Sequence, residues 1–345
     1  MDLPNDSALR SLLPLPPSTP LTATRHGGSS FSSTWRLTAS PSPSSSPSPS
    51  SSSSAPSTTV SFFLKTAAGP DARVMFAGEH ASLNAIADAV PGFCPRSYGT
   101  GELETKPGAW FLVTDFLDLG AGGGGGGGGK SKESGESLAR KLARLHTTTT
   151  PQGDGVEDGR YGFPVPTCCG STVQDNSWKT TWAEFYGECR LRHILDKGEE
   201  RNGPDEEVRA AVEETMSKVV PRLLGEGHLQ GVRPVVVHGD LWSGNHGRGR
   251  IEGRGGGVEE VVFDPSSVYG HSEYELGIMR MFGGFGEGFW REYGELVPRS
   301  EPVGEFEDRV VLYELYHYLN HYAIFGGSYK GSAMGIMKKL IAKYG

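Results

Sequence analysis

The sequence has few cysteines, no long hydrophobic run and no excess of basic residues. Four of its 345 residues are cysteine, namely Cys94, Cys168, Cys169 and Cys189, and they form no C-x-x-C or Cys/His pattern typical of a metal site. No run of about 18 apolar residues is present, so the sequence predicts no membrane span. The amino-terminal segment lacks the basic and apolar regions of a secretory signal. We therefore expect free thiols in the cytoplasm.

Charge and composition exclude further classes. The formal net charge is -8 and the isoelectric point is about 5.7, and no basic stripe that would bind nucleic acid is present. Many of the 50 glycines and 23 prolines lie in two low-complexity segments. Residues 40–58 are almost wholly Ser and Pro, and residues 122–129 are all glycine. Neither segment can bury apolar surface, so we expect a disordered hairpin insert and a flexible loop.

The chain is organised around two short apolar runs that each lead to a carboxylate. Val235–Val237 is typical of a buried strand and is followed by Asp240 and, five residues later, Asn245. Val261–Phe263 repeats the pattern before Asp264. In phosphoryl-transfer sites with this spacing, the first Asp accepts the proton of the attacking hydroxyl, and the Asn and second Asp hold Mg²⁺. The alternative is two unrelated turns capped by Asp and Asn.

The residues around this skeleton are more specific. The segments concerned are His238–Asn245 (HGDLWSGN), Phe263–Pro265, Tyr269–Glu273 and Met281–Phe285. Together they resemble the fructosamine 3-kinase, or ketosamine-3-kinase, family. The resemblance covers residues 27–329, apart from the low-complexity segments.

The resemblance implies both a fold and an activity. The family has a two-lobed, protein-kinase-like α+β fold related to aminoglycoside phosphotransferases, with an antiparallel β-sheet N-lobe and a mostly α-helical C-lobe. Its members use ATP to phosphorylate the sugar 3-hydroxyl of fructosamine or ribulosamine adducts, on small amines or glycated protein lysines. The 3-phosphate makes the adduct unstable and frees the amine, so the implied function is deglycation repair. Asp240 would be the catalytic base, and Asn245 and Asp264 the Mg²⁺ ligands.

We expect four regions along the chain. Residues 1–20 would be a weakly ordered lead-in, and residues 21–118 an N-lobe of five antiparallel strands and one long helix, with the insert at 40–58 as a hairpin tip. Residues 119–135 would be the Gly-rich flexible loop. Residues 136–345 would be the helical C-lobe that carries the catalytic loops.

Three N-lobe elements are candidates for binding phosphates. Gly27, Gly28 and Ser29 suit a glycine-rich hairpin whose backbone N–H groups approach phosphates, although Gly-Gly-Ser is also ordinary turn chemistry. Lys65 ends a Val/Phe/Leu strand, and in the kinase fold such a Lys contacts the phosphates and pairs with a helical Glu, here Glu79. Without the kinase resemblance, both side chains are typical of solvated residues.

The candidate residues for the hinge and for the sugar site each have an alternative structural role. Residues 109–117 form an apolar run typical of a strand that leaves the first lobe, and a plain core strand is the alternative. The adenine candidates are at its exit, namely Thr114, Asp115, Phe116 and Leu117. Trp242 lies two residues past the predicted base and is expected to form a wall for a sugar. The alternatives for Trp242 are packing beneath the loop and a place in the core.

The remaining C-lobe residues are expected to be structural. His238 would brace the catalytic turn, and Glu273 and Glu275 would be bracing or helix-start carboxylates. The charged segment 248–260 is typical of a solvated hairpin turn, and the Tyr-rich stretch from Arg309, continuing to 327, is typical of a core helix.

Two rival functions remain at this stage. Asp264 is followed by Pro265-Ser266 rather than Phe-Gly, which favours small-molecule kinases over protein kinases with a DFG switch. An aminoglycoside- or choline-type phosphotransferase would share the same skeleton. A catalytically dead nucleotide-binding scaffold is the other rival.

Overall fold

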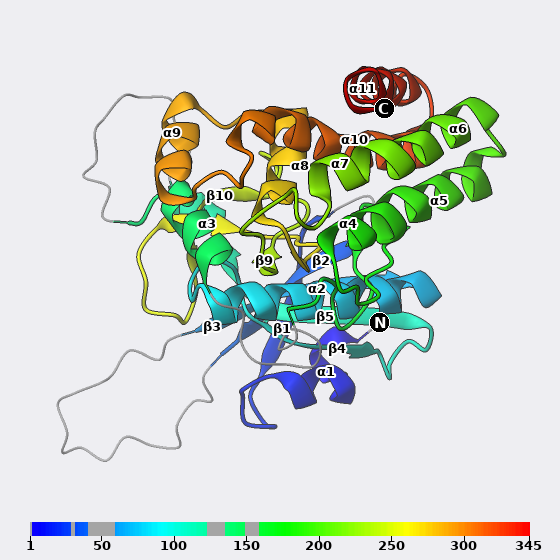
Figure 1. The fold of residues 1–345 in the computed structure, drawn as a ribbon. Coiled ribbons are helices and arrows are strands. Elements are labelled where there is room, and N and C mark those ends of the chain that lie inside the picture. Colours follow the sequence, from blue (N-terminus) through cyan, green and yellow to red (C-terminus); the bar gives the residue numbers. More distant parts are fainter. Residues whose placement is uncertain (1, 29–31, 41–58, 123–134, 149–158) are drawn as a thin grey trace, which may run out of the picture.

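The computed structural model describes residues 2–28, 32–40, 59–122, 135–148 and 159–345. These residues form two lobes, with a β-sheet lobe in the lower half of Figure 1 and a helical lobe above it. The predicted Ser/Pro insert, nearly all of the Gly-rich loop and Ser29 lie outside the described residues.

The N-lobe is a five-stranded antiparallel sheet in the order β1-β2-β3-β5-β4, as predicted. Its strands are β1 (Leu21–Gly28), β2 (Ser33–Ala39), β3 (Val60–Ala68), β4 (Ser97–Glu102) and β5 (Ala109–Asp115). Side chains alternate between the two faces of a strand. On β5, Phe111 and Val113 therefore face one apolar layer, while Leu112 packs with Phe76 of α2 (Pro70–Ala89) on the other.

The first twenty residues are not the weakly ordered lead-in that we expected. They include a short 3₁₀ helix (Leu3–Asn5) and α1 (Ser7–Leu12), whose Leu9 is fully buried against the sheet. Asp6 caps α1 by accepting a hydrogen bond from the Leu9 N–H at 3.1 Å, and it also accepts one from the Thr105 N–H at 2.8 Å. The apolar face of α1 covers one side of the sheet that would otherwise face water.

The segment at 248–260, expected to be a solvated hairpin turn, is a hairpin with an exposed tip, and it also holds the hinge. Its strands β10 (His246–Ile251) and β11 (Glu259–Val262) pair with each other, and β10 also pairs with hinge strand β6 (Leu117–Asp118). A short 3₁₀ helix, Leu119–Gly122, follows β6. Arg254, at the hairpin tip, bonds the Asp115 carboxylate at 2.9 Å. The hairpin therefore ties the C-lobe to the end of β5.

The C-lobe is mostly helical and packs around α10 (Figure 1). Its α-helices are α3 (Leu138–Thr147), α4 (Trp182–Glu184), α5 (His193–Asn202), α6 (Glu206–Glu214), α7 (Val220–Leu224), α8 (Glu275–Phe282), α9 (Glu287–Leu296), α10 (Phe306–Phe325) and α11 (Tyr329–Tyr344). The lobe also contains two π-helical segments, Phe185–Arg192 and Thr215–Val219, and two 3₁₀ turns, Ser272–Tyr274 and Val303–Glu305. A short strand pair is formed by β7 (Cys168–Cys169) and β8 (Thr172–Val173).

One strand pair places both predicted site loops together. β9 (Val235–Val237) pairs antiparallel with β12 (Val268–Gly270), with Val237 opposite Val268. The chain leaves β9 towards Asp240 and enters β12 from Asp264, so the two carboxylates lie at the same end of this pair.

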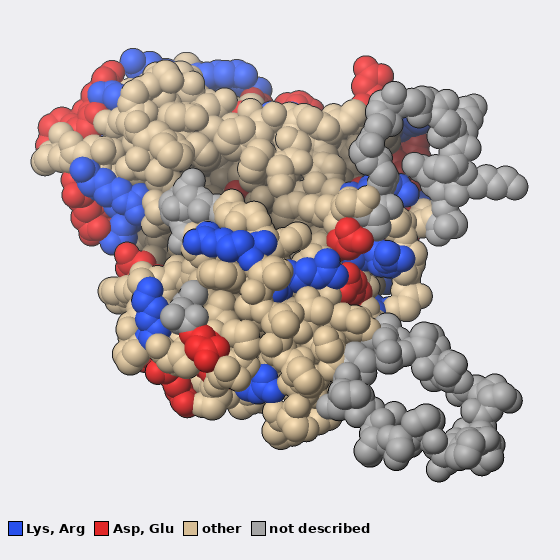
Figure 2. Space-filling view, turned by 180° about the vertical axis from the view of Figure 1, so that it is seen from behind, with Lys and Arg blue, Asp and Glu red and all other residues tan. Residues whose placement is uncertain are grey.

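One face of the molecule carries mixed charge. On the face seen in Figure 2, acidic and basic side chains lie close to one another rather than gathering by sign. Among the described residues, no helix has both the length and the apolar character needed to cross a bilayer.

Behind the site, a buried polar network joins α10 to the loop before α8. Arg309 forms an ion pair with Glu273 at 2.7 Å. His271 lies beside this pair, with its ring nitrogens 2.8 Å from the Tyr313 and Ser300 hydroxyls. Burial, opposed by Glu273 and assisted by Arg309, lowers the pKa of His271 to about 4.

We predict that this histidine makes the protein less stable in mild acid. Below the ordinary pKa of histidine, His271 binds a proton in the unfolded state but not in the folded state. The free energy of unfolding should therefore be unaffected by this group above about pH 6.5. It should fall by about 1.4 kcal/mol per pH unit from there towards pH 4. Urea unfolding at pH 7.5, 6 and 5 measures this, and His271→Gln should flatten the slope. Equal slopes of the free energy of unfolding against pH for His271→Gln and wild type would contradict the prediction. His26→Gln is the control, because His26 is exposed, and it should keep the wild-type slope.

Candidate active site

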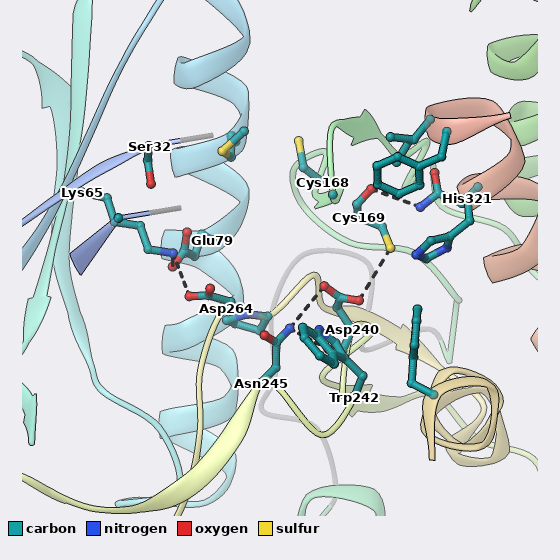
Figure 3. Close-up of a pocket in the computed structure, with 18 residues that line it drawn as sticks. Ser32, Lys65, Glu79, Cys168, Cys169, Asp240, Trp242, Asn245, Asp264 and His321 are labelled. Atoms are coloured by element: carbon teal, nitrogen blue, oxygen red, sulfur yellow. Dashed lines mark hydrogen bonds and ion pairs between the residues drawn. The ribbon is translucent and has the colours of Figure 1, made fainter. Parts of the chain in front are cut away.

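The site is built around the ammonium group of Lys65. Lys65 lies on β3, and its Nζ is 2.7 Å from Oε1 of Glu79 on α2 and 2.7 Å from Oδ1 of Asp264. Figure 3 shows the three side chains converging on one side of the cavity. Glu79 belongs to the N-lobe and Asp264 to the C-lobe, so one cation links the two lobes.

The charges of this cluster follow from its geometry. Burial acts to lower the pKa of Lys65, but the two carboxylates outweigh it and hold that pKa above its ordinary value. Burial acts to raise the pKa of Asp264, and the Lys65 ammonium overcomes this and lowers it. Lys65 is therefore a cation and Asp264 an anion at neutral pH.

The turn after β9 has a shape that requires glycine at its centre. Gly239 has a φ of +80°, and a Cβ placed there would lie 2.1 Å from the backbone oxygen of Ser266. The Glu275 carboxylate accepts hydrogen bonds from the backbone N–H groups of both His238 and Gly239, the latter at 3.0 Å. Glu275 thus braces the turn, which is the structural role expected of it.

His238 connects the two site loops. Its Nε2 lies 3.0 Å from the carbonyl oxygen of Phe263, and its Nδ1 accepts from the backbone N–H of Asp240 at 3.3 Å. A carbonyl oxygen can only accept, so Nε2 carries the proton and Nδ1 does not. Burial lowers the pKa of His238, which keeps this neutral form. His238 is a brace, as expected, and has no contact that would make it a base.

Asp240 is held by Asn245 of its own loop and by Cys169 of β7. The Asn245 amide donates to the Asp240 backbone oxygen at 2.8 Å and to its Oδ2 at 3.3 Å. The thiol of Cys169 donates to Oδ1, with 3.8 Å between sulfur and oxygen. Burial, together with the charges of Asp264 and Glu275, raises the pKa of Asp240 well above its ordinary value. The carboxylate is therefore a stronger base than an exposed Asp.

Asp264 has an unusual backbone conformation. Its φ is +56°, and among the described residues it is the only non-glycine with a positive φ. Such a conformation is sparsely populated by residues with a Cβ and persists where the surroundings enforce it. Here the short bond to Lys65 is one such restraint. The half-exposed Asp264 side chain points into the cavity.

Two adjoining cavities share the Lys65 cluster. The larger, of about 540 Å³, contains Asp240, Trp242 and Asn245 in its wall. The smaller, of about 280 Å³, lies towards the hinge and includes Phe63 and Leu83. Lys65, Glu79, Asp264 and Gly28 line both. The polar cluster therefore lies between a larger cavity and a smaller, more apolar one.

The predicted hinge residues do not all face the cavity. Thr114, Asp115 and Leu117 line the smaller cavity. The Asp115 carboxylate, however, is held by Arg254 and by the Tyr98 hydroxyl at 2.6 Å, so its role here is structural.

Two further nucleotide candidates lie outside both cavity walls. Phe116 is not part of either wall. Its buried ring lies beneath the Arg36 guanidinium, with 4.2 Å from the guanidinium carbon to the ring centroid. Gly27, with a φ of +71°, lies in the β1–β2 hairpin next to the lining residue Gly28, outside both walls.

Several residues of the larger cavity were missed from the sequence. Cys168 and Cys169 line it from β7, and Asn320 and His321 line it from α10. The stretch around Asn320 was expected to be helix core because apolar residues such as Leu319 surround it. Only the resemblance of this stretch to the kinase family could have indicated that it also lines the cavity.

Known proteins of similar sequence point to one family. The family model described as fructosamine kinase matches residues 48–343. The chain is 34% identical over 288 residues to the ketosamine-3-kinase of Mus musculus, which covers 81% of this chain and 87% of that protein. It is 36% identical over 279 residues to the chloroplastic protein-ribulosamine 3-kinase of Arabidopsis thaliana, which covers 80% of this chain and 75% of that protein.

Solved structures share the fold. A crystal structure from Thermobifida fusca, named as a fructosamine-3-kinase, has a TM-score of 0.67 at 21% identity and covers 94% of this chain and 95% of that one. The aminoglycoside phosphotransferase APH(4)-Ia has a TM-score of 0.51 at 13% identity and covers 93% of this chain and 94% of that one. At these identities the likeness concerns the fold alone, and it confirms the predicted kinase-like α+β architecture.

We predict that Gly239→Ala disrupts the catalytic turn. A Cβ would meet the Ser266 carbonyl, and a positive φ costs a residue with a Cβ about 1–3 kcal/mol. Thermal unfolding should show a lower Tm, and phosphoryl transfer should fall more than ATP binding. Gly288→Ala on α9 is the control, because nothing lies near its added Cβ. It should keep the Tm or raise it slightly. A Gly239→Ala variant with unchanged Tm and activity would contradict the prediction.

Proposed function

The chain belongs to the fructosamine kinase family, and we propose that it uses ATP to phosphorylate the sugar 3-hydroxyl of fructosamine or ribulosamine adducts. It is a phosphotransferase, which removes the dead-scaffold alternative. The observation that carries the proposal is the lining of one cavity by Lys65, Asp240 and Asp264 in the order and geometry of a phosphoryl-transfer site.

The residues of this cavity support the following division of labour. Asp240 accepts the proton of the 3-hydroxyl as its oxygen attacks the γ-phosphorus of ATP. The new bond joins the sugar oxygen to phosphorus, and the bond to the β-phosphate oxygen breaks, so ADP leaves with the electron pair. Lys65 holds the phosphates, Glu79 positions Lys65, and the backbone at Gly28 borders the same space.

The donor set fits Mg²⁺, which prefers oxygen ligands and keeps several waters. Asn245 uses its amide nitrogen on Asp240, which leaves its Oδ1 for a metal, and Asp264 uses Oδ1 on Lys65. Within the described ranges, no group of three or more His, Cys, Asp or Glu side chains can hold a metal by itself. Mg²⁺ at Asn245 and Asp264 would therefore also need phosphate oxygens, whose charge it would neutralise.

The walls of the cavity favour a sugar over a polycation. Trp242 is 38% exposed beside the base, where its ring offers a flat apolar surface to a sugar. The carboxylates of the larger cavity are Glu79, Asp240 and Asp264, all committed to the catalytic cluster. An aminoglycoside with several ammonium groups would need further acidic partners. We propose small-molecule ketosamines or glycated protein lysines as substrates, and the cytoplasm as the compartment, which the four free thiols support.

A substrate panel tests this function. Purified protein should consume ATP with a fructosyl- or ribulosyl-amine and should not do so with kanamycin-like aminoglycosides or with choline. The measurement is ADP formation, with inorganic phosphate release recorded separately to exclude simple hydrolysis. Robust turnover of only the aminoglycosides or choline would overturn the proposed substrate while leaving the catalytic residues in place.

Asp240→Asn provides the catalytic control for that panel. Asn keeps the shape of Asp but cannot accept the proton, so turnover of the ketosamine should fall by about 10²–10⁴-fold. ATP binding, measured by calorimetry or by a fluorescent analogue, should be retained. Near-wild-type turnover would show that Asp240 is not the base.

A further inference from the structure

Five ring side chains form a continuous surface that starts at the catalytic turn. Trp242 lies 5.7 Å, between ring centroids, from Phe282 at the end of α8, which lies 5.3 Å from His321 on α10. His321 in turn lies 5.7 Å from Phe325 and 5.1 Å from Tyr329 of α11. We call these five residues, Trp242, Phe282, His321, Phe325 and Tyr329, the aromatic shelf.

The shelf contains half of the exposed large hydrophobic residues in the described part of the chain. Trp242, Phe282 and Phe325 are 38%, 42% and 65% exposed, and they are three of only six large hydrophobic residues that are exposed in the described part of the chain. Single exposed apolar side chains are ordinary, but contiguous ones mark binding surfaces. Gly326 and Gly327, with φ of +65° and +66°, end α10 directly after Phe325 and turn the chain into α11.

The shelf is continuous with the catalytic cavity. Trp242, Phe282, His321 and Phe325 line the same 540 Å³ cavity as Asp240. Lys65, Glu79 and Asp264 lie on its opposite side, where the phosphates of ATP would bind (Figure 3). A substrate whose hydroxyl reaches Asp240 therefore has the shelf as one apolar wall of the cavity.

The chemistry of a ketosamine indicates what would lie there. Its nitrogen is attached to C1 of the sugar, two carbons from the C3 hydroxyl that meets Asp240. With the sugar against Trp242, the nitrogen and its substituent extend along the shelf. Ammonium groups are attracted to aromatic faces. No carboxylate among the described lining residues lies outside the catalytic cluster to serve this cation instead.

The protonation state of His321 supports this arrangement. Its Nδ1 lies 2.8 Å from the backbone carbonyl oxygen of His317 and so must donate a proton to it. Burial lowers the pKa of His321, so the ring is neutral at physiological pH. The shelf therefore presents no positive charge that would repel the ammonium of a ketosamine.

We propose, on the basis of the proposed function, that the aromatic shelf binds the nitrogen substituent of the ketosamine and selects substrates in which it is aromatic or a long apolar chain. The sugar sets where the phosphate is added, and the shelf sets which amines are accepted. Burial of one aromatic substituent should give about a 10- to 100-fold preference over a methyl group.

Two ketosamines with the same sugar test this inference. Wild-type kcat/KM should be at least about tenfold higher for 1-benzylamino-1-deoxyfructose than for the 1-methylamino compound, mainly through KM. Phe325→Ala should reduce this ratio by about tenfold, whereas Phe325→Tyr, which keeps the ring, should retain it. Leu296→Ala is the control because Leu296 is also exposed, at 39%, but lies on α9 outside the cavity wall. It should leave the ratio unchanged.

The outcomes distinguish a failure of the shelf proposal from a failure of the proposed function. Equal kcat/KM for the two compounds in the wild type would overturn the shelf proposal and leave the kinase function intact. An equal loss for both compounds in Phe325→Ala would also overturn it, since that indicates a structural role. Turnover of neither compound by the wild type would overturn the proposed function itself, and the shelf proposal with it.

Discussion

One ammonium group, that of Lys65, lies between two carboxylates from different lobes, and the arrangement of the site depends on it. A buried cation is stable only when it is paired and hydrogen-bonded. Glu79 and Asp264, each 2.7 Å away, supply that pairing. The bond to Glu79 fixes α2 against β3, and the bond to Asp264 fixes the C-lobe loop that also holds a strained backbone. The same ammonium group therefore joins the two lobes and positions the residues of the proposed phosphate site.

The C-lobe side of the site is held by a separate set of hydrogen bonds. The catalytic turn is held through backbone contacts of Glu275, Gly239 and His238. Asp240 is therefore positioned by its main chain as well as by its side-chain partners. Further out, the hairpin around Arg254 holds the hinge through Asp115. The aromatic shelf, in contrast, has large exposed rings. This difference suits a site in which the phosphoryl-transfer geometry is fixed and the amine side of the substrate varies.

The sequence predicted those parts of the site that are encoded locally or by a short motif. Asp240, Asn245 and Asp264 were found by their spacing, and the pairing of Lys65 with Glu79 by the resemblance to a kinase family. The contact of Cys169 with Asp240 and that of Arg254 with Asp115 join residues 71 and 139 positions apart, so no local pattern indicates them. The orientation of the Phe116 ring likewise depends on what packs against it. The same holds for the folded structure of the first twenty residues.

The central claim is that Lys65 and Asp240 direct the γ-phosphoryl group of ATP to O3 of a ketosamine. The most direct test is phosphorus and carbon NMR of the product formed from ATP and a fructosylamine labelled with ¹³C at every sugar carbon. The account predicts phosphorus–carbon coupling to C3 and to its neighbours C2 and C4, followed by release of the free amine. A phosphate on any other sugar oxygen, or on the nitrogen, would contradict it.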